Sequence, residues 1–192
     1  MRAFIAVTLP DDIRASLSAV QGQLAASAAD VKWVAGDALH VTLKFLGEIT
    51  DGQRQAVEDM LRHVAGGVAP FEMRLAGVGA FPSVAAPRVV WVGIVEGREA
   101  LSQLADAIER EREPLRLPGE RRPFAAHVTL GRVRSPTRRQ VLTEQLRAAA
   151  WHPPAPWRVT SLALYQSTLT PSGPTYTVLA TIPLASHAVH SP

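Results

Sequence analysis

The stretch HVTLKFLG at residues 40–47 shares its first four letters with HVTLGRVR at residues 127–134. Side chains alternate between the two faces of a β-strand, so the histidine and the threonine of each copy would point to one side. The valine and the leucine of each copy would point to the other side, toward a core. The repeat therefore predicts two half-buried strands, each of which presents an imidazole and a hydroxyl together.

The polar side chains of the repeat, His40, Thr42, His127 and Thr129, are the candidate catalytic residues. Imidazole titrates near neutral pH, so one ring could accept a proton while the other donates one at the same phosphate. Threonine hydroxyls could stabilise the charge that builds on the phosphate oxygens. A single strand histidine beside a threonine is more often an ordinary surface pair. The repetition favours an acid/base pair in one cleft.

Two cations near the repeat are candidate substrate-binding residues. Lys44 lies four positions after His40, which on a regular strand puts it on the same face, within reach of the cleft; an exposed lysine at a strand end fits equally well. Arg132 lies five positions after His127 and would point away on a regular strand. We hypothesise a β-bulge at Gly131 that turns Arg132 toward the cleft, where its guanidinium could bind phosphate or stack on a base.

The rest of the chain predicts an α+β fold. Helical periodicity occurs at about residues 11–24, 51–64, 101–108 and 135–146. Segments rich in β-branched and aromatic residues predict strands at about residues 2–8, 31–34, 39–46, 71–78, 88–95, 124–133, 157–167 and 175–183. Each half of the chain then holds two helices and about four strands, a pattern open to an internal duplication.

Helix starts and loops follow from local composition. The helix-start candidates are Asp11 or Asp12 for the first helix, Thr50 or Asp51 for the second, and Ser135 with Pro136 for the fourth. Proline-rich or charged segments predict loops at residues 82–87, 113–123 and 151–156, of which residues 116–122 could form a flexible flap beside a site.

Composition limits the function classes. The 192 residues, 47% hydrophobic and 19% charged, have enough apolar surface for one domain over residues 1–192, with residues 185–192 as a frayed tail. The absence of cysteine excludes disulfides and thiolate nucleophiles and makes the cytoplasm the default compartment. No carboxylate cluster, signal segment or membrane-length apolar run is present. We expect a monomer in the cytoplasm that uses no metal, no other cofactor and no membrane.

The sequence pI of about 9.9 is a mild indication of a polyanionic partner, whereas the net charge of +3 is modest. Much of the positive charge comes from arginines in the second half of the chain: Arg121, Arg122, Arg132, Arg134, Arg138 and Arg139. An arginine-rich surface that merely faces solvent explains this composition equally well.

Five segments resemble the RNA 2′,3′-cyclic phosphodiesterases, also called 2′-5′ RNA ligases, of the two-histidine phosphoesterase superfamily. They are HVTLKFLG, GAFP at 79–82, RVVWVGI at 88–94, FAAHVTLGRVR at 124–134 and LYQSTLTPSGPTYTVLATIPL at 164–184. The resemblance implies a bilobed fold of two pseudosymmetric lobes, each with an antiparallel sheet and two helices, and an active-site cleft between them. The family commonly has proline before the second histidine, where this chain has Ala126.

The resemblance also implies an activity and residue roles. The substrate would be RNA with a 2′,3′-cyclic phosphate terminus, or a small cyclic nucleotide, and hydrolysis would open the cyclic phosphate to a 2′-phosphate. The same enzyme could also join RNA ends through a 2′-5′ linkage without a nucleotide triphosphate. His40 would be the general acid and His127 the general base, although pseudosymmetry leaves this assignment open. Thr42, Thr129 and Arg132 would hold the phosphate.

The sequence also allows two alternative functions. The arginine content also fits a module that binds RNA ends without turnover, for which paired proton-transfer groups would be unnecessary. The same catalytic residues would equally serve a phosphodiesterase that acts on 2′-5′ oligonucleotides or on another small cyclic phosphate. Product analysis separates these hypotheses.

Overall fold

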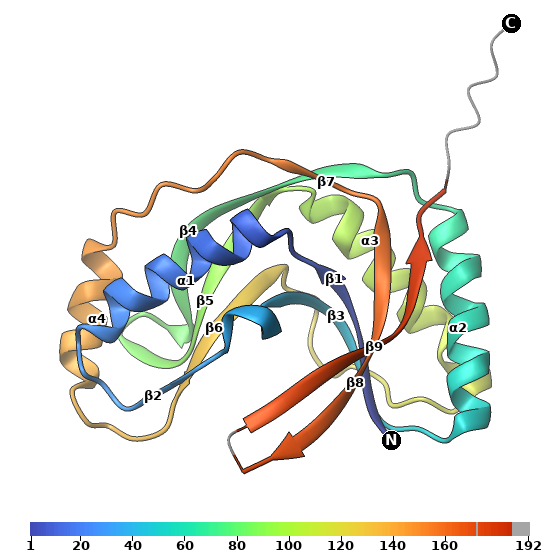
Figure 1. The fold of residues 1–192 in the computed structure, drawn as a ribbon, viewed down its shortest axis with the longest axis horizontal. Helices are drawn as coiled ribbons and strands as arrows, with labels where there is room; N and C mark the ends of the chain where they lie inside the picture. Colours follow the sequence, from blue (N-terminus) through green and yellow to red (C-terminus); the bar gives the residue numbers. More distant parts are fainter. Residues whose placement is uncertain (172, 186–192) are drawn as a thin grey trace, which may run out of the picture.

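Two antiparallel sheets, each packed against two helices, form the two lobes of the computed structural model (Figure 1), which describes residues 1–171 and 173–185. The first lobe has a four-stranded sheet in the order β3 (His40–Glu48), β1 (Arg2–Thr8), β8 (Ser161–Thr170) and β9 (Gly173–Pro183). Helices α2 (Asp51–Gly66) and α3 (Arg98–Glu111) pack against this sheet.

The second lobe is built on a five-stranded sheet. Its strands lie in the order β2 (Val31–Trp33), β6 (His127–Val133), β5 (Ala86–Glu96), β4 (Phe71–Ser83) and β7 (Trp157–Val159). Helices α1 (Asp11–Ala25) and α4 (Arg139–Ala148) belong to this lobe, and two short 3₁₀ helices, η1 (Gly36–Ala38) and η2 (Glu113–Leu115), lie in connections. The predicted α+β, bilobed architecture with two helices per sheet is confirmed.

The lobes do not correspond to the two halves of the chain. The first sheet combines β1 and β3 from the N-terminal half with β8 and β9 from the C-terminal half. Helix α1 directly follows β1 but lies in the other lobe, and α3 follows β5 but packs on β3 (Figure 1). Strands β3 and β6, which carry the repeated motif, contact each other where the lobes meet.

The predicted helix starts are correct in part. Thr50 caps α2 because its side chain accepts a hydrogen bond from the Gln53 backbone N–H, and the Gln53 side chain accepts one from the Thr50 N–H. Helix α1, however, begins at Asp11 itself. Pro10 occupies the N-cap position, and no side chain caps the helix there. Its aspartates therefore lie in the first turn, where a negative charge favours the helix dipole.

The fourth helix begins later than predicted. Ser135 does not cap it; the Ser135 hydroxyl accepts a hydrogen bond from the Thr137 backbone N–H and closes a short turn. The helix then starts at Arg139, after Arg138 in a left-handed conformation. This local side-chain bond competes with the helix for the same backbone segment and moves its start by a few residues.

The predicted loop at residues 82–87 is wrong, because β4 and β5 continue as a hairpin around a turn at Val84 and Ala85. The expected strand at residues 157–167 is divided between two sheets, since the chain crosses from β7 to β8 at Thr160. The other two predicted loops contain no helix or strand apart from η2.

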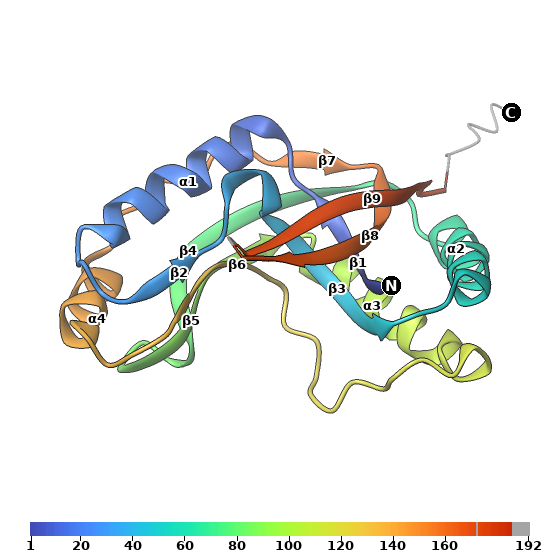
Figure 2. The same ribbon diagram turned by 60° about the horizontal axis from the view of Figure 1, so that its bottom comes forward.

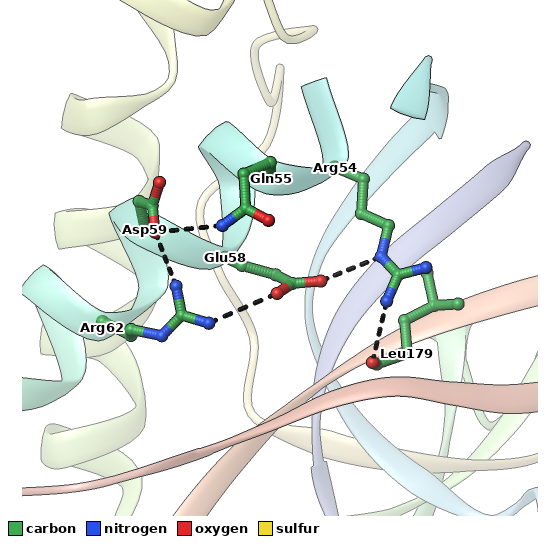
Figure 3. Close-up of polar contacts among 6 residues, drawn as sticks. All are labelled: Arg54, Gln55, Glu58, Asp59, Arg62 and Leu179. Atoms are coloured by element: carbon green, nitrogen blue, oxygen red, sulfur yellow. Dashed lines mark hydrogen bonds and ion pairs between the residues drawn. The ribbon is translucent and has the colours of Figure 1, made fainter. Parts of the chain in front are cut away.

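A polar network fastens α2 to the first sheet. Arg54 donates hydrogen bonds both to the Glu58 carboxylate on its own helix and to the Leu179 carbonyl on β9 (Figure 3). Glu58 also pairs with Arg62, one turn further along the helix. The outer helix of the first lobe is thus held by directional bonds as well as by its buried apolar side chains, which include Val57 and Leu61.

Within residues 1–171 and 173–185, no helix is long and apolar enough to cross a membrane. The C-terminal tail predicted to fray lies, apart from Ala185, outside the described residues.

Candidate active site

The two motif histidines are held in the same way. The Nδ1 atom of His40 lies 2.7 Å from the Ala38 carbonyl oxygen, and Nδ1 of His127 lies 2.6 Å from the Ala125 carbonyl oxygen. A carbonyl can only accept a hydrogen bond, so each Nδ1 carries a proton and donates it. Each half-buried ring therefore keeps Nε2 as the atom that can take up or release a proton at neutral pH.

The pKa of both imidazoles lies below the ordinary value of 6.5. Burial is the main cause for each ring, since it disfavours the charged form, whereas the carbonyl bond acts in the opposite direction. The charge of His127 lowers the pKa of His40 further, and that of Arg132 lowers the pKa of His127. The two rings therefore lie within electrostatic reach of each other.

Aromatic side chains fix the orientation of both rings. The Phe4 ring lies 4.7 Å from the His40 ring, centroid to centroid, and the Tyr176 ring meets His40 edge-on at 5.3 Å. In the other lobe, the Phe81 ring meets His127 edge-on at 5.1 Å. Sequence reasoning did not assign Phe81 or Tyr176 to the site. Phe81 lies in the GAFP segment of the family resemblance, and Tyr176 lies in its C-terminal segment.

A cavity of about 430 Å³ opens between the lobes beside these rings. The motif residues Thr42, His127 and Thr129 line it together with Arg132. His40 adjoins Thr42 on the same strand face but does not line this cavity itself. Three aromatic rings also line the cavity, and they belong to Phe45, Phe81 and Phe124.

The bulge hypothesis for β6 is confirmed. Trp91 of β5 pairs with Thr129 and the preceding Val90 pairs with Gly131, which leaves Leu130 as the extra residue. Leu130 and Gly131 are consequently both buried. The strand parity changes at this point, and Arg132 turns toward the cavity on the side of His127.

The strand face predicted for Lys44 is wrong for the same reason, although Lys44 does reach the cavity, as predicted. Ile5 of β1 pairs with Lys44 and Ala6 pairs with Thr42, so Leu43 forms an equivalent bulge in β3. Lys44 therefore leaves the face of His40; its side chain is 2% exposed, and Nζ donates to the Glu109 carboxylate at 2.6 Å. It borders the cavity with its charge already paired.

The equivalent bulges give the two strands matching positions with different chemistry. Phe45 occupies in β3 the place that Arg132 occupies in β6, five positions after the histidine. Its side chain is 52% exposed and lines the cavity. The site is therefore asymmetric despite its pseudosymmetric strands. One lobe contributes a guanidinium at this position and the other lobe contributes an aromatic ring.

The described residues contain no group of three or more His, Cys, Asp or Glu side chains placed to hold a metal ion.

Two lobes that meet along a pair of His-x-Thr strands define the class of two-histidine phosphoesterases. Within that class, the chain belongs to the 2′-5′ RNA ligase superfamily, whose family model matches residues 9–170.

Relatives span nearly the whole chain. The RNA 2′,3′-cyclic phosphodiesterase of Methanothermobacter thermautotrophicus is 37% identical over 92% of this chain and 95% of its own. That of Archaeoglobus fulgidus is 36% identical, over 92% of this chain and 96% of its own.

Solved structures share the fold over a similar length. TT0787 of Thermus thermophilus superposes with a TM-score of 0.80 at 33% identity and covers 97% of this chain and all of its own. E. coli LigT, crystallised with 3′-AMP, superposes with a TM-score of 0.74 at 27% identity. The match covers 96% of this chain and 98% of the LigT chain.

Proposed function

We propose that the chain opens 2′,3′-cyclic phosphate ends of RNA to 2′-phosphates by acid/base catalysis between His40 and His127. The observation that carries the proposal is the matched Nδ1–carbonyl bond, which leaves a reactive Nε2 atom on each ring. The charge of His127 also lowers the pKa of His40. The relatives named RNA 2′,3′-cyclic phosphodiesterase support the choice of substrate.

In the proposed reaction, His127 takes a proton from water, and the resulting oxygen attacks phosphorus. The bond from phosphorus to O3′ breaks while His40 delivers a proton to O3′, which leaves a 3′-hydroxyl and a 2′-phosphate. Thr42 and Thr129 donate hydrogen bonds to the nonbridging oxygens, and Arg132 balances their charge. The reaction returns the two histidines with their protons exchanged, and solvent restores them.

Burial lowers the pKa of both rings, and Arg132 acts on His127 in addition. Burial and, after it, the charge of Arg132 lower the pKa of His127, so that in the free enzyme this ring is neutral and ready to act as a base. The negative charge of a bound cyclic phosphate would raise the pKa of His40 and favour the protonated form that an acid requires.

The cavity beside the phosphate position suits the terminal nucleoside. Phe45, Phe81 and Phe124 offer faces on which a base can stack, and stacking accepts every base. We therefore expect the substrates to be RNA ends or small cyclic nucleotides, with little base preference. As a separate expectation, the protein acts as a monomer in the cytoplasm.

The same groups could join RNA ends. If the 5′-hydroxyl of a second RNA takes the place of water, the attack forms a 2′-5′ phosphodiester while O3′ leaves as before. No nucleotide triphosphate is consumed, because the energy comes from the strained cyclic phosphate.

Product analysis tests the proposal. A dinucleotide that ends in a 2′,3′-cyclic phosphate is incubated with wild type, His40→Ala and His127→Ala in the presence of EDTA. The expected product from wild type is the 2′-phosphate, with little turnover by either variant. A 3′-phosphate product or full activity in His127→Ala would overturn the proposal; salt-sensitive binding without turnover in wild type would favour the RNA-binding alternative.

A further inference from the structure

The loop between η2 and β6 forms one wall of the cavity. It runs from the α3 side of the molecule back to β6 (Figure 2), with no helix or strand over residues 117–126. Glu120, Arg122, Phe124 and Ala125 from this loop line the cavity. Its position therefore affects how closely a nucleoside fits.

One carboxylate on α3 collects the hydrogen bonds that hold this loop. Glu109 accepts from the Lys44 ammonium at 2.6 Å, from Arg112 Nε at 2.6 Å and from the Glu120 backbone N–H at 3.1 Å. Arg112 in turn donates to the Leu117 carbonyl. These bonds tie the start of the loop to α3 and, through Lys44, to the β3 motif strand.

The far end of the loop is tied to a motif histidine. The Ala125 carbonyl is the acceptor for Nδ1 of His127. Residues 120–125 are thus stretched between Glu109 and His127, while Lys44 stands directly before Phe45 on the opposite wall. A single carboxylate therefore connects both walls of the cavity.

We propose that Glu109 is a positioning residue that holds residues 120–125, and with them Arg122, against the nucleoside of the bound substrate. This inference rests on the proposed function. Glu109 touches no reacting atom in this account. Its loss would let the wall move away from the substrate, weakening binding more than it slows the chemical step.

The test combines kinetics with proteolysis. For Glu109→Gln, KM for a dinucleotide 2′,3′-cyclic phosphate should rise about tenfold, as expected for a lost positioned contact, with a much smaller change in kcat. Trypsin should cut faster after Arg116 and Arg121, as followed by mass spectrometry. The matched control is Glu111→Gln, an exposed carboxylate on the same helix with no ion pair among the described residues, which should change neither reading.

A second variant separates positioning from simple charge pairing. Glu109→Gln leaves the buried Lys44 ammonium without its partner, which can destabilise the fold by itself. The double variant Lys44→Met with Glu109→Leu removes both charges, and it also removes the acceptor for the Glu120 N–H, which the amide oxygen of a glutamine can still provide. We expect it to keep the raised KM and the faster cleavage.

Normal KM and normal trypsin resistance in the double variant would overturn the proposal, as would a fall in kcat with unchanged KM in Glu109→Gln. If no enzyme form turned over the dinucleotide, the proposed function would fail. The trypsin comparison would still test whether Glu109 holds the loop.

Discussion

Each motif histidine is oriented by a carbonyl two residues before it, and this bond selects the tautomer. Because Nδ1 holds the proton, only Nε2 is left for chemistry, and both rings acquire this property without any other side chain. The repeat in the sequence was enough to predict which residues these are. The aromatic partners were beyond prediction, since Phe4 and Tyr176 reach His40 from separate strands of the sheet.

The lowered pKa values predict the pH dependence of the reaction. Activity falls on the acid side when His127 becomes protonated and on the alkaline side when His40 loses its proton. Both pKa values lie below 6.5, so kcat/KM should follow a bell with its maximum below pH 6.5. Steady-state kinetics between pH 4 and 9 measure it.

Arg132→Met provides a control for this profile. This substitution should lower activity. It also removes a positive charge that lowers the pKa of His127, so the acid limb of the pH profile of kcat/KM should move to higher pH. A profile that is flat across the range, or an acid limb that does not move, contradicts the role given to His127.

At the scale of elements, a bulge in each motif strand decides which side chains reach the cavity. The bulge in β6 was predictable because Gly131 marks it, whereas Leu43 and Lys44 carry no such signal and the strand parity gave the wrong face for Lys44. The alternation of side chains along a strand therefore predicts the face of a residue only up to the first bulge. The match between Phe45 and Arg132 became visible only from the paired register.

Gly131 is predicted to be needed for the packing of β2 against β6. A Cβ atom at this position would lie 2.7 Å from Cγ1 of Val31 and 2.8 Å from Cε3 of Trp33. Gly131→Ala should therefore destabilise the protein by about 1–3 kcal/mol, the usual cost of overpacking, and reduce activity. Urea unfolding measures the loss.

The matched control is Gly22→Ala in α1, where a Cβ atom meets nothing within 4 Å. This change should leave stability unchanged or raise it by about 0.5–1 kcal/mol, because alanine favours a helix more than glycine does. Equal stability of the two variants would show that the contact at Gly131 is of no consequence.

At the scale of the whole molecule, the lobes are interleaved along the chain. Periodicity predicted the helices and most strands, but it could not assign them to lobes, because pairing between strands far apart in sequence depends on packing and not on local pattern. The four-stranded sheet is complete only when β8 and β9 join β1 and β3. Neither half of the chain contains a whole lobe.

This interleaving predicts that residues 1–192 unfold as one domain. Thermal unfolding should give a single transition that coincides for near-UV circular dichroism, far-UV circular dichroism and loss of activity. A fragment of residues 1–96, which lacks β8 and β9, should remain unfolded. Two separate transitions, or a fragment with native-like structure, would contradict this prediction.

In the proposed mechanism, two imidazoles from different lobes act on one phosphorus atom. This mechanism is tested most directly by kcat/KM for a 2′,3′-cyclic phosphate in wild type, His40→Asn, His127→Asn and the double variant. Groups that act as a unit show losses that do not add, so the double variant should be little worse than either single one. Single losses that multiply in the double variant, or a single variant with wild-type activity, would contradict this mechanism.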